Sequence, residues 1–196
     1  MIAVVDYGAG NLVSVKKALD WLGQDSQITR DPSQIRAAAK IVLPGVGHFA
    51  STRALADSGA HSAIKDSIER GVPFLGICVG MQWMLEGSAE SPETRGSGLF
   101  RGTCERLPDT GKLPHVGWNH LAITRDSKLF RDVPQSSLVY FTHSYCIPLN
   151  QWTVASCEYG VNFSSAIERG NLFGVQFHPE KSGEVGLKLL ANFCAI

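Results

Sequence analysis

The stretch Val72-Pro73-Phe74-Leu75-Gly76-Ile77-Cys78-Val79-Gly80-Met81-Gln82 decides the fold of this chain. Its first four residues predict a buried strand and residues 81–86 predict a helix, so that Cys78 lies between the two elements. A nucleophile on a sharp strand-to-helix turn needs glycine neighbours, because larger side chains would clash there. The stretch predicts a thiol nucleophile elbow, in which the helix N-terminus favours the reactive thiolate. Taken alone, it fits a buried cysteine in a glycine-rich turn equally well.

The segments around this elbow change character along the chain. Up to residue 86, apolar runs at 2–5 and 41–43 alternate with helical spacing over 12–22 and 55–69. That order predicts right-handed crossovers and a parallel sheet. From about residue 97 the segments become β-like, and they end in a hairpin around Gly170-Asn171 and a helix from Ser182. We therefore expect one α/β domain over residues 1–196, with a mainly parallel sheet that antiparallel strands extend.

Composition narrows the class of protein. The chain has 196 residues, and its 18 basic and 18 acidic side chains cancel, which does not favour nucleic acid or a membrane as a partner. The five cysteines are widely spaced and odd in number, which argues against a disulfide framework or a zinc site. The first residues do not predict a signal peptide, because they lack a basic segment and reach Asp6 at once, and the sequence has no apolar run of about 20 residues. We expect a reduced, cytoplasmic protein without a metal or a cofactor.

A cysteine nucleophile needs a base, and the base needs a group that orients it. His178 directly follows the apolar segment 172–177, so it is expected at the same sheet edge as Cys78. Glu180 lies two residues further on, and in extended backbone its side chain projects to the same side as that of His178. Alone, this segment fits a turn with a solvated charge better. Paired with the elbow, it predicts a Cys78–His178–Glu180 triad.

The loop Pro44-Gly45-Val46-Gly47 supplies the third expected part of the site. It follows the apolar run 41–43, and its two glycines allow the amides of Val46 and Gly47 to turn toward a developing oxyanion. The amide of Val79, at the helix start, is the second expected donor. An ordinary strand-to-helix turn explains this loop equally well when it is considered alone.

With these parts in order, the chain resembles the class I (triad) glutamine amidotransferases over essentially its whole length. The resemblance implies their flavodoxin-like three-layer fold, with a mainly parallel central sheet flanked by helices. Five segments narrow it to the glutaminase subunits of imidazole glycerol phosphate synthases: residues 6–11, 44–47, 76–82, 115–119 and 177–182. Val46 in the oxyanion loop and the sequence Gly117-Trp118-Asn119 are the marks of that branch.

The resemblance implies hydrolysis of glutamine to glutamate and ammonia through a thioester on Cys78. The ammonia would pass to a (β/α)₈ synthase (cyclase) subunit, bound as a heterodimer. That subunit makes imidazole glycerol phosphate and aminoimidazole carboxamide ribotide in histidine biosynthesis. The family's oxyanion hole is thought to form fully only when the partner binds its ligand, so we expect the isolated chain to be a poor glutaminase. Two alternatives are a glutaminase subunit of another triad amidotransferase and a non-catalytic ligand-sensing relative.

The same resemblance suggests residues around the triad. Gln82 lies one helical turn after Cys78, where the family binds glutamine, and Ser144 and Tyr145 match the segment that holds the α-carboxylate through backbone amides. The expected substrate-binding residues are Gly45, Gln82, Glu90, Ser144 and Tyr145. The positions expected to face the partner are Trp118, Asn119, Tyr140 and Lys181. Cys104, Cys146, Cys157 and Cys194 have no partner at catalytic spacing and are expected to be inert.

Overall fold

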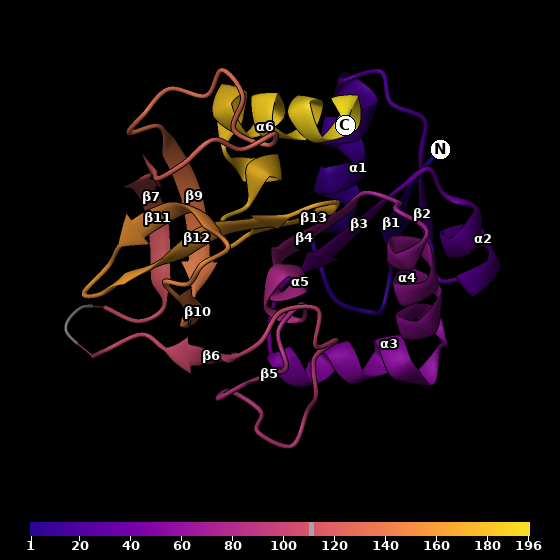
Figure 1. The fold of residues 1–196 in the computed structure, drawn as a ribbon, viewed down its shortest axis with the longest axis horizontal. Helices are drawn as coiled ribbons and strands as arrows, with labels where there is room; N and C mark the ends of the chain where they lie inside the picture. The colour runs from indigo at the N-terminus through magenta and orange to yellow at the C-terminus, as the bar shows by residue number, and fades with distance from the viewer. Residues whose placement is uncertain (110–111) are drawn as a thin grey trace.

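The computed structural model describes residues 1–109 and 112–196, and its central feature is a mixed β-sheet (Figure 1). One half of the sheet is parallel, in the order β2-β1-β3-β4-β13. Its strands are β1 (Ile2–Val5), β2 (Ser26–Thr29), β3 (Lys40–Gly45), β4 (Phe74–Cys78) and β13 (Leu172–Val175). The helices are α1 (Leu12–Trp21), α2 (Pro32–Ala37), α3 (Arg53–Asp57), α4 (Ala60–Glu69), α5 (Val79–Gln82) and α6 (Gly183–Ala195). This half matches the predicted parallel sheet.

The other half is mainly antiparallel, as expected from the later segments. The hairpin partner of β13 is β12 (Asn162–Arg169), which pairs in turn with β10 and β11. The remaining strands of this sheet are β5 (Gly87–Ser88), β6 (Thr103–Arg106), β8 (Ala122–Ile123), β10 (Tyr145–Pro148) and β11 (Thr153–Glu158). A separate antiparallel pair, β7 (His115–His120) with β9 (Leu138–His143), lies at the left of Figure 1. Two short 3₁₀ helices are η1 (Phe49–Thr52) and η2 (Pro179–Lys181).

The hydrophobic core lies on both faces of the parallel half. Alternate strand residues face opposite sides, so Val4 joins one apolar cluster while Ala3 and Val5 join the other. Helices α1 and α6 cover the first face, and α2, α3 and α4 cover the second (Figure 1). Burial on both faces explains why these strands read as continuous apolar runs. The arrangement gives the three layers expected of the fold.

The structure corrects the expected elements at several points. The helix predicted over 55–69 is two helices, because Gly59 adopts a left-handed backbone (φ 77°) between α3 and α4. Strand β2 and helix α2 were not predicted, since their polar residues hide the apolar periodicity. Among the β-like segments expected after residue 97, residues 115–123 form two strands, β7 and β8, and residues 138–148 form two more, β9 and β10. Across the described residues, no helix is long and apolar enough to cross a bilayer.

Candidate active site

The elbow at Cys78 has the strained geometry that its glycines indicated. Cys78 has φ 54° and ψ −110°, a backbone that L-residues rarely adopt, and it joins β4 directly to α5. A Cβ on Gly76 would lie 2.5 Å from the carbonyl oxygen of Gly80, and a Cβ on Gly80 would lie 1.8 Å from that of Leu43. Both glycines are therefore required by close backbone contacts.

The helix after the elbow differs from the prediction. It begins at Val79 and ends at Gln82, so it has a single turn in place of the helix expected over 81–86. Tighter bonds follow, from the amides of Met84 and Leu85 to carbonyls three residues earlier. The dipole of a helix grows with the number of aligned peptides. A single turn therefore gives less electrostatic stabilisation to a negative charge at Cys78 than the longer helix expected from the sequence.

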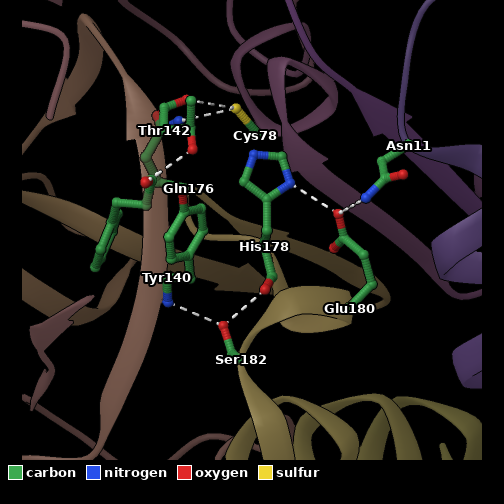
Figure 2. Close-up of polar contacts among 9 residues, drawn as sticks. Asn11, Cys78, Tyr140, Thr142, Gln176, His178, Glu180 and Ser182 are labelled. Atoms are coloured by element: carbon green, nitrogen blue, oxygen red, sulfur yellow. Dashed lines mark hydrogen bonds and ion pairs between the residues drawn. The ribbon is translucent and has the colours of Figure 1, made fainter. Parts of the chain in front are cut away.

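His178 and Glu180 form the second part of the site. Strands β13 and β4 are parallel, with Val175 opposite Ile77, so Cys78 and His178 emerge at the same sheet edge. Figure 2 shows the His178 ring between the other two side chains, with Nδ1 2.8 Å from Oε1 of Glu180. Both side chains are about 1% exposed. Among the described residues, Nε2 of His178 has no hydrogen-bond partner, which leaves it free to exchange a proton with the thiol.

The surroundings of His178 favour its protonated form. Burial by itself lowers the pKa of this imidazole, but the neighbouring Cys78 and Glu180 side chains outweigh burial and raise the pKa to about 10. A carboxylate held 2.8 Å from Nδ1 also fixes the orientation of the ring. The geometry therefore provides an oriented, proton-carrying histidine beside a cysteine.

Three further residues form hydrogen bonds to the predicted triad residues, and the sequence analysis had not assigned them this role. Asn11 occupies the N-cap position of α1, but its side chain donates to Oε1 of Glu180 at 3.2 Å (Figure 2). Gln176 donates to Sγ of Cys78 at 3.6 Å. Ser182 accepts a bond from the amide of Tyr140 and donates to the carbonyl of His178. Segments 6–11 and 177–182 stand out in the sequence as motifs. No rule of sequence spacing, however, predicts a hydrogen bond between Asn11 and Glu180, which are 169 positions apart.

The predicted oxyanion loop runs along the elbow. Gly45 of β3 pairs with Cys78 of β4, and a Cβ on Gly45 would lie 2.6 Å from the Tyr7 hydroxyl and 2.7 Å from the amide nitrogen of Gly80. Gly47 instead adopts φ 90° and has open space around its Cα. The two glycines thus serve different needs, since Gly45 allows close packing and Gly47 allows a left-handed backbone.

A cavity of about 40 Å³ beside the thiol gathers most of the predicted substrate residues. Its lining comes from four segments of the chain: Gly47, Cys78, Val79, Gln82, Glu90, Thr142, His143, Ser144 and Tyr145. Gln82 is only 2% exposed, which excludes a surface role, and it donates to the carbonyl of Tyr145. Glu90 accepts a bond from the amide of Phe49 at 2.7 Å. The cavity is far smaller than the roughly 300 Å³ of small ligand pockets, so it must widen to admit a substrate.

Three of the four positions predicted to face a partner form one exposed patch. Trp118 is 54% exposed, which excludes a core role, and its ring packs edge-on against Tyr140 at 6.0 Å. Lys181 places its ammonium 5.7 Å from the centre of the Tyr140 ring. The fourth, Asn119, is half-buried and donates to the carbonyl of Glu158 within its own chain.

The other four cysteines do not line the cavity beside Cys78. Cys104, Cys146 and Cys157 are buried, and burial raises the pKa of Cys146 and of Cys157 to about 12. Their thiols therefore stay protonated, which agrees with the prediction that they are inert. In the described part of the chain, no three His, Cys, Asp or Glu side chains gather in a way that could hold a metal.

Comparisons with known proteins agree with this geometry. Residues 3–196 match the family model described as "Glutamine amidotransferase class-I". A relative from Moorella thermoacetica, named "Imidazole glycerol phosphate synthase subunit HisH", is 49% identical over 98% of this chain and 93% of its own. A relative of the same name from Caldanaerobacter subterraneus subsp. tengcongensis is 46% identical over 98% and 97%.

A comparison of folds gives the same architecture. The structure titled "Structure of PurLQS from Thermotoga maritima" superposes with a TM-score of 0.78 at 20% identity, covering 99% of this chain and 97% of the other. At that identity the likeness concerns the fold alone. It matches the three layers described above.

Proposed function

This chain belongs to the class I glutamine amidotransferase family, in the branch of the HisH subunits, and on that premise we propose that Cys78, His178 and Glu180 are its catalytic triad. The observation that carries the proposal is the buried pair of His178 and Glu180 at the sheet edge that bears the Cys78 elbow. The elbow presents a nucleophile, and the oriented imidazole supplies the proton transfers that amide hydrolysis needs.

The proposed reaction proceeds in two halves. The sulfur of Cys78 attacks the side-chain amide carbon of glutamine, and His178 keeps the thiol proton until it protonates the leaving amine. Ammonia departs and a thioester remains on Cys78. Water, deprotonated by His178, then attacks the thioester and releases glutamate with the free thiol. The amides of Val79 and of Val46 or Gly47 are the proposed donors to the oxyanion. Removal of one such donor typically raises the activation barrier by roughly 3–4 kcal/mol.

The cavity beside the thiol provides the proposed substrate contacts. Ser144 and Tyr145 would bind the α-carboxylate through their amides, and Glu90 would accept from the α-amino group. Gly45 and Gln82 complete the proposed substrate-binding set. The cavity lining supports all of these except Gly45, which lies behind the elbow.

The chain is the glutaminase subunit of an imidazole glycerol phosphate synthase, which serves histidine biosynthesis. Its ammonia goes to the (β/α)₈ cyclase subunit of that enzyme, in a heterodimer. We assign the exposed patch of Trp118, Tyr140 and Lys181 to this interface, since Trp and Tyr are enriched at binding hot spots. Asn119 belongs to the same proposed interface through the strand that it shares with Trp118. Residues 1–196 act as a single amidotransferase domain.

A cytoplasmic location fits this role. The five cysteines are free, as expected of a chain that works in a reducing compartment.

The decisive experiment measures glutamate and ammonia release from glutamine, by the chain alone and by its complex with the cyclase subunit and that subunit's ligand. We expect the complex to be active and the isolated chain to be slow. Cys78→Ala should lower the rate of the complex by about 10³-fold or more, because Cys78 is the one cysteine among the described residues that line the cavity. Cys194→Ser, on α6, is the matched control and should leave the rate unchanged. Undiminished turnover in Cys78→Ala would favour a ligand-sensing relative.

A further inference from the structure

A continuous chain of hydrogen bonds runs along one wall of the cavity, from strand β7 to the thiol of Cys78. On β7, Asn119 donates to Nε2 of His115 at 3.4 Å, and Nδ1 of His115 lies 3.1 Å from Nε2 of His143. Nδ1 of His143 lies 3.0 Å from the carbonyl oxygen of Tyr145. The proposed triad mechanism uses neither histidine.

The same carbonyl connects the chain to Cys78. Gln82 donates to the Tyr145 oxygen at 2.9 Å and to Oε1 of Gln176 at 3.1 Å. Gln176 then donates to the thiol of Cys78 at 3.6 Å. The Tyr145 carbonyl therefore receives two bonds, one from the histidine pair and one from a residue that lines the cavity.

Each partner along this chain fixes where the hydrogens lie. The side-chain oxygen of Asn119 accepts from the amide of His120, so its nitrogen must be the donor to His115. Nε2 of His115 is then an acceptor, and its hydrogen is on Nδ1, which donates to His143. Nε2 of His143 accepts that bond, so its own hydrogen is also on Nδ1, which donates to Tyr145. Both rings are neutral in this arrangement, and no hydrogen is left over.

The packing around the pair agrees with neutral rings. The His115 ring is stacked between Tyr159 and Phe141, at 4.0 Å and 4.7 Å between ring centres, and is 2% exposed. His143 is 6% exposed and packs against Phe163. Burial lowers the pKa of His115 to about 4 and that of His143 to about 3. Neither histidine carries a charge at neutral pH.

We propose that His115 and His143 are positioning residues, a neutral pair that holds the Tyr145 carbonyl and thereby the Ser144–Tyr145 peptide and the Gln82 amide in the geometry that receives glutamine. The proposal rests on the proposed function, because it assigns these groups to the glutamine pocket. Its physical basis is that one rigid donor, buried and fixed by stacking, defines the position of a backbone carbonyl at the wall of the cavity. The pair transfers no proton in the reaction.

The kinetic test uses the complex with the cyclase subunit and two variants at one position. His143→Leu removes the donor to Tyr145, and we expect KM for glutamine to rise about three- to tenfold, the usual effect of one lost hydrogen bond, with kcat within about twofold. His143→Asn keeps a nitrogen donor near the place of Nδ1 and should return KM to within about twofold of wild type. His115→Phe keeps the aromatic stacking but loses the donor to His143, and it should raise KM less than His143→Leu does. His120→Asn, on the same strand with its ring outside the chain of bonds, is the matched control and should leave KM unchanged.

Two kinetic results would overturn the proposal. If His143→Asn and His143→Leu behave alike, the donor to Tyr145 does not matter. If both variants lose kcat at unchanged KM, His143 acts in the chemical step.

A second measurement does not depend on activity, so it separates this proposal from the assignment of the function. Two-bond ¹H–¹⁵N correlation spectra of the isotope-labelled chain report which ring nitrogen carries hydrogen. At pH 7 we expect the hydrogen on Nδ1 in both His115 and His143. A hydrogen on Nε2, or a protonated ring, at either residue would contradict the proposed pair even in a fully active enzyme. Inactivity with the expected tautomers would instead count against the proposed function.

Discussion

The elbow at residues 76–80 and the tip of the neighbouring loop at Gly47 both depend on glycine, but for different reasons. In the elbow, a Cβ on Gly76 or Gly80 would lie within 2.5 Å of a backbone carbonyl oxygen, so these residues are fixed by contact. At the tip of the loop, a Cβ on Gly47 would meet nothing within 4 Å, and only its φ of 90° calls for glycine. The Cys78 elbow is thus held by packing, as is Gly45 at the base of the loop, whereas the tip of the loop at Gly47 has open space.

The largest effect should follow from adding one methyl group to the elbow. Gly80→Ala places its Cβ 1.8 Å from the Leu43 oxygen, where only a backbone shift can relieve the clash. We expect the free energy of unfolding to fall by more than about 3 kcal/mol, the upper end of overpacking effects. Urea denaturation of the purified chain measures this. A loss below about 1 kcal/mol would show that the elbow is as adaptable as the loop.

A smaller effect should follow from removing the charge beside His178. Glu180→Gln keeps an acceptor but loses the carboxylate, so the pKa of His178 should fall from about 10 toward 6.5. The imidazolium is then lost at lower pH, and the alkaline limb of the glutaminase profile should move to lower pH. We expect kcat of the complex at pH 8 to fall about 100-fold. Glu184→Gln, at the exposed start of α6, is the control and should leave the profile unchanged.

The open loop should respond in activity more than in stability. Gly47→Ala meets no clash, and its strained backbone should lower the free energy of unfolding by only about 1 kcal/mol. We expect kcat of the complex to fall about tenfold, because the strained alanine would displace the amides of Val46 and Gly47, the proposed oxyanion donors. Steady-state kinetics and urea denaturation of one preparation test both parts. A stability loss as large as that of Gly80→Ala would remove the contrast between the two segments.

The effect that is smallest at neutral pH concerns how the stability of the chain depends on pH, and its source lies at the wall of the cavity. The pKa of His143 is about 3 when folded and about 6.5 when unfolded, so the unfolded chain binds the extra proton. Its contribution to stability is complete above pH 6.5 and is lost as the pH falls toward 3. His143→Asn should therefore make the stability curve shallower between pH 6 and 4, by up to about 1.4 kcal/mol per pH unit. Identical slopes for wild type and variant would contradict a neutral, buried His143.

Much of the fold followed from local patterns. Strands β1, β3, β4 and β13 are apolar runs that end in glycine or polar segments, and their order predicted the parallel sheet. Helix α2 and strand β2 escaped prediction because only Ile35 of α2 is buried, too little for a periodic signal. The break at Gly59 also escaped, since one glycine within a helical pattern does not reveal its φ.

The candidate site likewise contains residues that local motifs predicted and residues that only the structure brought to it. The sequence predicted Cys78, His178 and Glu180 as a triad because each lies in a segment whose local geometry has chemical meaning, and the structure brings the three side chains to one edge of the sheet. Asn11, Gln176 and the His115–His143 pair were not assigned to the site, because their partners lie far away in the sequence or on other strands. A hydrogen-bond partner from another strand depends on register, which local patterns do not encode.

The sequence alone determined the elbow, the order of the proposed triad residues along the chain and the division of the sheet, because glycine spacing and apolar periodicity act over a few residues. The tertiary structure decided which side chains meet. It placed Asn11 on Glu180, and it brought Tyr145 between Gln82 and His143. The physical reason is that short-range backbone constraints are fixed by neighbours in the chain, whereas hydrogen-bond partners across a core are chosen only when strands pair and pack.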